Sequence, residues 1–172
     1  MEKYSKCMVR IHWIHGALIA FVLLSGGLIL SNMPDNAEKI GSLKGHMILG
    51  ILITVITFVR IFKIRKHPEM KPLSVGAGRE AIIKWNHRLI YLFLVVVGLS
   101  GMIAAKTSGL GDIVFLGKEA ELYADATSLS KLAGTVHAVS TKILMALIVM
   151  HVAGIFSYMI KTKENVLKRM WF

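Results

Sequence analysis

The chain contains four apolar segments, and each is long enough to cross a lipid bilayer as a helix. They cover residues 11–31, 43–64, 81–105 and 132–160. A helix needs about 20 apolar residues to cross roughly 30 Å of hydrocarbon, and it satisfies its backbone hydrogen bonds within its own segment. The sequence therefore predicts an all-α integral membrane protein, a four-helix bundle that forms a single domain over residues 1–172.

The composition agrees with a membrane location. Hydrophobic residues make up 55% of the chain, which is more than the core of a water-soluble domain of this length requires. The first segment follows directly on the charged stretch KYSKCMVR, without a clear cleavage site of small residues. We therefore interpret it as a retained helix and not as a signal peptide.

Basic residues are distributed unequally between the two sides of the predicted bundle. The N-terminal stretch, the linker between the second and third segments, and the C-terminal tail, each with its flanking helix ends, carry fifteen Lys and Arg residues. The other two loops carry five, together with six acidic residues. The positive-inside rule therefore predicts that both termini are cytoplasmic. The net charge of +11 is explained by this topology, and no clustered motif indicates nucleic acid as a partner.

Several classes of site are excluded by the absence of their motifs. Cys7 is the only cysteine, so the chain has no disulfide, no thiolate metal site and no C-x-x-C-H attachment for a covalent haem. No glycine-rich nucleotide-binding motif and no nucleophile elbow is present. A haem in this protein would have to be bound without thioether bonds.

The fourth apolar segment includes the stretch GTVHAVSTKILMALIVMHVAGIF, which carries two histidines, His137 and His151. Fourteen residues of helix separate them, which corresponds to a rise of about 21 Å and a rotation that returns to within roughly 40° of the same face. Both imidazoles should therefore project from one side of this helix, near its opposite ends.

Two further histidines match these in depth. His46, near the outward start of the second segment, lies at the level of His137. His12, near the cytoplasmic start of the first segment, lies at the level of His151. Two imidazoles from different helices at one level are the arrangement needed to supply both axial ligands of a haem. The alternative is that intramembrane histidines form hydrogen bonds between helices.

Glycine spacing favours haem over the alternative. A macrocycle can approach a helix closely only where small residues flank its ligand, and each of these four histidines has a glycine three or four positions away. The pairs are His12 with Gly16, His46 with Gly50, His137 with Gly134, and His151 with Gly154. Glycine is also a general packing residue in membrane helices.

The chain resembles the bacterial cytochrome b561 family over nearly its whole length. The resemblance is carried by RIHW at the first helix, KGHMILG at the second, His137 and His151 in the fourth, and KENVLKRM near the end. The resemblance implies a four-helix protein of the bacterial inner membrane that binds two non-covalent b-type haems. His12 and His151 would be the iron ligands of the cytoplasmic-side haem, and His46 and His137 those of the outward haem. It also implies electron exchange with membrane quinone, ubiquinone or menaquinone, and in some members oxidation of superoxide at the outer face.

Other polar residues have two or more interpretations. Arg10, Arg60, Lys84 and Arg88 lie where they could contact haem propionates or quinone, or they are topology charges. His87 is an alternative ligand, a quinone-site group or a polar residue at a helix start. The remaining candidates are expected to be structural: His15 an interfacial packing residue, His67 solvated, and Lys142 directed away from the haem side.

Three functions remain open on the sequence alone. Two histidine ligands leave no free iron position, so such haems pass electrons and do not activate oxygen. The first hypothesis is an oxidoreductase that couples quinone to a one-electron partner such as superoxide. The second is an electron-relay cytochrome subunit of a membrane-bound hydrogenase or dehydrogenase complex. The third is a non-redox membrane protein that binds another metal. The short outward loops favour the first.

Overall fold

The computed structural model describes residues 4–34, 36–66, 76–118 and 127–171, and these residues form helices and connecting turns only. The long helices are α1 (Lys6–Leu24), α2 (Ala37–Lys66), α3 (Ala77–Thr107) and α5 (Ser128–Thr162). Short elements complete the fold: the π-helical turn η1 (Ser25–Ile29) and the 3-10 turn η2 (Leu30–Asn32) after α1, helix α4 (Leu110–Leu116), and the 3-10 helix η3 (Val166–Met170). All four predicted spans are long and apolar enough to cross a membrane, which confirms the four-helix membrane bundle.

The four spans are longer than the apolar segments that predicted them. Each begins four to six residues earlier than predicted and ends one or two residues later. Hydropathy detects only the part of a helix that lies in hydrocarbon, whereas the backbone remains helical until it is capped. The Ser5 side chain caps α1 by accepting from the amide of Met8, and Thr127 caps α5 by accepting from the amide of Ser130.

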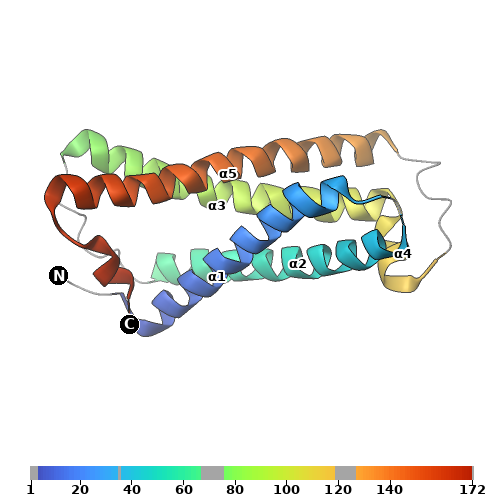
Figure 1. The fold of residues 1–172 in the computed structure, drawn as a ribbon, viewed down its shortest axis with the longest axis horizontal. Helices are drawn as coiled ribbons and strands as arrows, with labels where there is room; N and C mark the ends of the chain where they lie inside the picture. Colours follow the sequence, from blue (N-terminus) through green and yellow to red (C-terminus); the bar gives the residue numbers. More distant parts are fainter. Residues whose placement is uncertain (1–3, 35, 67–75, 119–126, 172) are drawn as a thin grey trace.

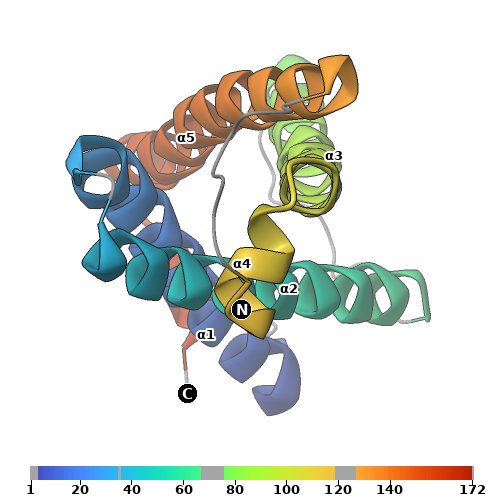
Figure 2. The same cartoon turned by 90° about the vertical axis from the view of Figure 1, so that its right-hand side faces the viewer.

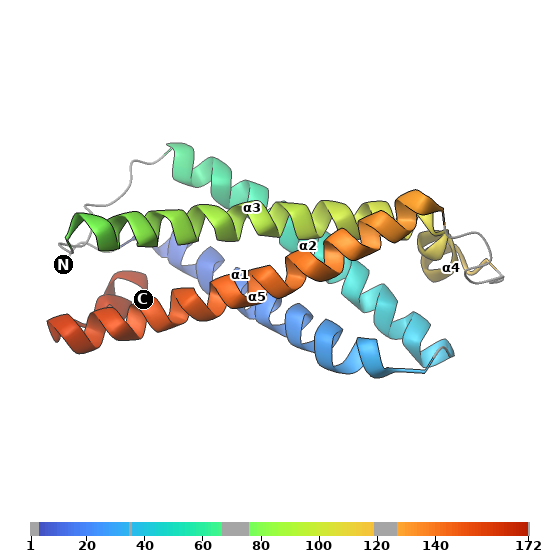
Figure 3. The same cartoon turned by 90° about the horizontal axis from the view of Figure 1, so that it is seen from above.

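The long helices form two pairs that face each other. Figure 2 shows α3 and α5 together on one side and α1 and α2 on the other, and Figure 3 shows α5 crossing α3 at a shallow angle. Each long helix contributes one residue to the buried apolar centre: Ile19, Ile53, Leu94 and Leu144. Lipid tails are as apolar as these side chains, so close packing between helices has to stabilise the bundle.

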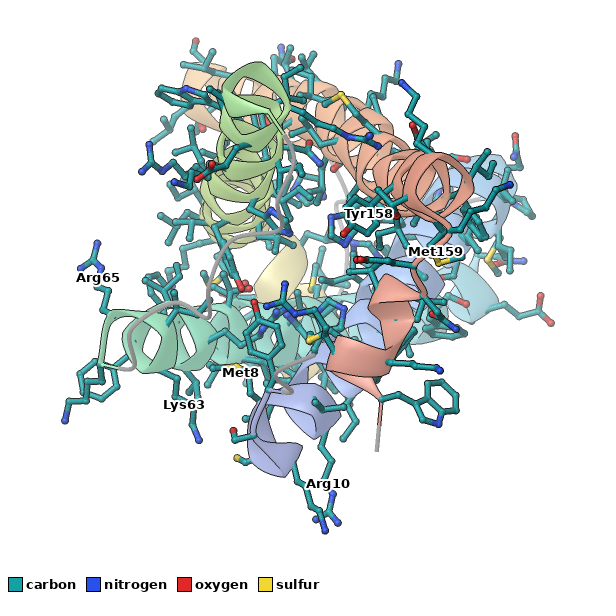
Figure 4. The ribbon with its side chains drawn as sticks, turned by 90° about the vertical axis from the view of Figure 1, so that its left-hand side faces the viewer. Met8, Arg10, Lys63, Arg65, Tyr158 and Met159 are labelled. Carbon is teal, nitrogen blue, oxygen red and sulfur yellow. The ribbon has the colours of Figure 1, made fainter. Side chains whose placement is uncertain are left out.

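The two ends of the bundle differ. One end, which we call the terminal end, holds the start of α1, the end of α2, the start of α3 and the end of α5 (Figure 1). The other, the opposite end, holds η2 and α4. At the terminal end the chain turns back after α5 through Lys163, which has a left-handed backbone (φ 59°). Figure 4 shows Arg10, Lys63 and Arg65 pointing away from the bundle here.

The returning tail is attached to the start of α1. The indole N–H of Trp13 donates to the carbonyl of Met170 at 2.7 Å, and the amide of Tyr4 donates to the carbonyl of Arg169 at 3.1 Å. The rings of Trp13 and Trp171 also meet edge to face, with centroids 6.2 Å apart. The first and last described segments of the chain are thus joined directly.

We expect Trp13→Phe to weaken this attachment, because phenylalanine keeps an apolar ring but cannot donate to Met170. A hydrogen bond of this kind contributes about 1 kcal/mol, so the midpoint of thermal unfolding should fall by a few degrees. Proteolysis of the tail should also become faster. Trp85→Phe, at the same end but on α3, is the matched control. Equal tail cleavage in both variants would contradict the prediction.

Candidate functional site

At the opposite end, His46 of α2 faces His137 of α5. Their ring centroids are 6.3 Å apart and the ring planes are inclined by 76°. Two imidazoles that bind one metal ion from opposite sides, each with a metal–nitrogen distance of about 2 Å, have ring centres roughly 6 Å apart. The fold therefore brings together the predicted outward pair, and at a separation that suits a shared ion.

Each ring of this pair packs against a glycine on a neighbouring segment. A Cβ atom added to Gly101 of α3 would lie 2.9 Å from Cε1 of His137, and one added to Gly26 of η1 would lie 3.1 Å from Cε1 of His46. In both rings the edge formed by Nδ1 and Cε1 is the one that faces the glycine. Gly26 belongs to a π-helical turn, a distortion that is frequent at functional sites.

The two histidines differ in their remaining ring nitrogen. Nδ1 of His137 lies 2.9 Å from the carbonyl oxygen of Val97. Because a carbonyl can only accept, Nδ1 carries the proton and Nε2 keeps its lone pair, which is the usual state of a metal-binding histidine. Nδ1 of His46 is buried and has no partner among the described residues. Buried polar atoms are rarely left unpaired, so this nitrogen is free to pair with a group that the described residues do not supply.

At the terminal end, three imidazoles from three helices converge. His12 of α1 lies close enough to His151 of α5 and His87 of α3 to interact electrostatically with both. The rings of His87 and His151 are in edge-to-face contact, with centroids 4.9 Å apart and planes inclined by 79°. The predicted pair of His12 and His151 is brought together, and His87 joins it.

We call His12, His87 and His151 the terminal-end layer, and His46 with His137 the opposite-end layer. Arg60 of α2 connects the terminal-end layer to a further histidine of α1, His15. Its Nη2 donates to Nδ1 of His12 at 3.0 Å and its Nη1 to Nδ1 of His15 at 3.3 Å. Both rings therefore carry their proton on Nε2 in this arrangement, and His12 could bind a metal through Nε2 only if Arg60 gave up its bond to Nδ1 and the proton moved there. The guanidinium also lies over the ring of Tyr91, 5.5 Å from the centroid. Its Nε is buried and has no partner among the described residues. A buried cation with a free donor suits an anionic or carbonyl group.

His15 is a packing residue, as expected, but it packs inside the bundle and not at the membrane interface. Its side chain is fully buried in the bundle, at 0% exposure. Because Nδ1 accepts from Arg60, Nε2 carries the proton and donates to the carbonyl oxygen of Ile53 at 3.2 Å. The hydroxyl of Thr57 lies 3.2 Å from the same nitrogen. His15 therefore supports Arg60, and both of its ring nitrogens already have partners within the chain.

The other basic candidates are exposed and are directed elsewhere. Arg10 points away from the bundle (Figure 4). Lys84 pairs with Glu80 at 2.6 Å, and Arg88 lies over the ring of Trp85 at 5.4 Å. Of the four basic side chains predicted to contact propionates or quinone, Arg60 is the one that the structure brings to the histidines; His87, the fifth candidate, lies among them. Lys142 is exposed, and His67 lies outside the described residues.

The model of the family described as prokaryotic cytochrome b561 matches residues 3–172. The chain belongs to this family. It is therefore a multi-pass membrane b-type cytochrome that takes part in electron transfer and binds b-type haem. A comparison with curated proteins finds no match to this cytochrome.

The residues of the cytochrome fit such a group. Beside the four predicted ligands, a Cβ atom added to Gly16, Gly50, Gly134 or Gly154 would meet no atom within 4 Å other than its chain neighbours and the backbone of its own helical turns. Among the described residues, no group of three or more His, Cys, Asp or Glu side chains could hold a metal ion. A haem carries its own four equatorial ligands and needs only two imidazoles from the protein, and each end of the bundle offers at least two.

We expect Gly101→Ala to disturb the haem site of this cytochrome at the opposite end, because the new methyl group would collide with the His137 ring. The purified protein should lose part of its haem or show a shifted spectrum from one haem component. Absorption spectra and the ratio of haem to protein measure this. Gly41→Ala, on α2 where a Cβ meets open space, is the control. Identical spectra for both variants would mean that the glycine contact does not hold the ring.

Proposed function

We propose that this cytochrome holds two non-covalent b-type haems and exchanges electrons between membrane quinone and a one-electron partner on the other side of the membrane. His46 and His137 would ligate one haem, and His12 and His151 the other. The observation that carries the proposal is the pairing of imidazoles from different helices at two depths. In the pair formed by His46 and His137, which has no third imidazole beside it among the described residues, the ring centroids are 6.3 Å apart.

The orientation rests on charge. The terminal end holds most of the basic residues, and the side chains of Arg10, Lys63 and Arg65 point outward there (Figure 4). By the positive-inside rule this end lies on the cytoplasmic side of the bacterial inner membrane. The His46 and His137 layer then lies toward the outer face, about 21 Å away along α5 from the level of His151.

The residues of each layer perform distinct tasks. Each pair of imidazoles would supply two ligands to a haem iron, so no open position would be left for oxygen. When bound, the two haems supply one-electron redox chemistry at two depths. The carbonyl of Val97 orients His137 and raises its basicity through Nδ1. At the other layer, Arg60 would offer its unpaired Nε donor to a propionate or to a quinone oxygen.

The two-haem arrangement predicts a defined ratio of cofactor to protein. We expect pyridine haemochrome analysis to give about two b-type haems per chain, all released by acidified acetone, because the single cysteine offers no thioether attachment. His46→Ala and His137→Ala should each remove the same spectral component. His12→Ala should remove the other.

Two results would contradict the two-haem arrangement. A value near one haem per chain would show that one of the layers is structural only. Loss of one and the same spectral component in His46→Ala and His12→Ala would overturn the assignment of ligands to layers. Lys142→Gln, on the exposed side of α5, is a control that should leave both components in place.

Superoxide is the one-electron partner that we propose, and Lys44 and Lys131 are the basic residues nearest in sequence to the two outward ligands. Both are exposed, and a local positive field accelerates the encounter with a small anion. We expect Lys44→Gln combined with Lys131→Gln to slow haem reduction by a superoxide source about 10-fold or less, and more weakly at high salt. Reduction by quinol should be nearly unchanged.

The same kinetics separate the proposal from its alternative. Equal slowing by superoxide and by quinol would indicate damage to the haem site. An isolated chain that is reduced by quinol but is inert to superoxide would support the second function, an electron-relay subunit of a hydrogenase or dehydrogenase complex. Larger size in mild detergent, owing to a bound partner subunit, would support the same conclusion.

A further inference from the structure

The terminal-end layer contains one imidazole more than a haem needs. His87 was left open by the sequence as a ligand, a quinone-site group or a polar residue at a helix start. In the structure it lies on α3 against His151 of α5, and His12 of α1 lies within electrostatic range of both rings. The layer at the opposite end has two imidazoles among the described residues, so this surplus is specific to one end.

His87 and His151 occupy the same side of the site. They belong to α3 and α5, the pair of helices that faces α1 and α2 (Figure 2). Their centroids are 4.9 Å apart, which is shorter than the roughly 6 Å required when two imidazoles bind one ion from opposite sides. The two rings are therefore positioned to compete for one axial position, with His12 on the other side.

The local hydrogen bond of His87 prepares it as a ligand. Its Nδ1 lies 2.8 Å from the carbonyl oxygen of Ile83, one turn earlier in α3. The carbonyl accepts, so Nδ1 carries the proton and Nε2 keeps a free lone pair. His137 shows the same pattern with the carbonyl of Val97. This second bond is the usual companion of a metal-binding imidazole.

We propose that His87 is a second ligand for the axial position that His151 occupies, so that the cytoplasmic-side haem is held by His12 together with either His151 or His87. This inference rests on the proposed two-haem function. His12 has no such substitute on its own side, since the nearest histidine there, His15, donates through Nε2 to Ile53 and accepts from Arg60 through Nδ1.

The asymmetry gives a direct test in the full-length chain. We expect His151→Ala and the milder His151→Gln to retain about two haems per chain with a low-spin spectrum, because His87 completes the coordination. The near-infrared and electron paramagnetic resonance signals of the cytoplasmic-side haem should shift, since the ligand geometry changes. Adding His87→Ala to either variant should reduce the content to about one haem per chain. His12→Ala alone should do the same.

His137→Ala is the matched control, because the described residues offer no third imidazole at its level, and it should lose one haem. A fall to about one haem, or a high-spin signal, in the single His151 variants would overturn the proposal. So would failure of both His151 variants to accumulate while His12→Ala accumulates. A wild-type protein with fewer than two haems would instead refute the proposed function, which keeps the two failures distinguishable.

Discussion

The structure depends on the rule that a polar atom inside a membrane needs a partner, because hydrocarbon offers none. Nδ1 of His137 and both ring nitrogens of His15 find partners within the chain. Three side-chain atoms do not: Nδ1 of His46, Nε of Arg60 and Oδ1 of Asn86 are buried without a partner among the described residues. His46 and Arg60 lie in the histidine layers, and Asn86 directly precedes His87 on α3. The packing of the two helix pairs thus leaves hydrogen-bonding atoms without partners near the proposed haem sites. At His15 and His137 the chain itself supplies the partners.

The two layers meet this requirement differently. At the opposite end, glycine backbone holds the rings: Gly26 and Gly101 each approach one imidazole so closely that a methyl group would not fit without a shift. At the terminal end, hydrogen bonds and charge take over, because Arg60 joins His12 to His15. A ring held by backbone has one orientation, whereas a layer of three imidazoles and a guanidinium has several satisfactory arrangements. Specific ligation by a fixed pair therefore suits one end, and exchange of ligands suits the other.

Hydropathy predicted the four spans, and counting residues along them predicted which histidines share a depth, because rise per residue is nearly constant in a helix. Rotation between helices was not accessible in this way. Arg10 and Arg60 were equivalent in sequence, yet Arg10 points outward and Arg60 inward. Gly26 and Gly101 are distant in sequence from the rings they contact, so the search beside each ligand could not find them. His15 could have been found, since residues three apart share a helix face and His12 already faced the interior.

The residue that attaches the tail to α1 lies directly beside a histidine of the terminal-end layer. Trp13, which donates to Met170, follows His12 directly, and the two rings meet edge to face with centroids 5.6 Å apart. His12 in turn accepts from Arg60 of α2. The first turns of α1 are therefore held from two sides, by the tail and by α2. In the ligand set that we propose, His12 has no substitute, so its position is the one at this end that most needs to be fixed. The tail, which includes η3, supports it from one side and α2 from the other.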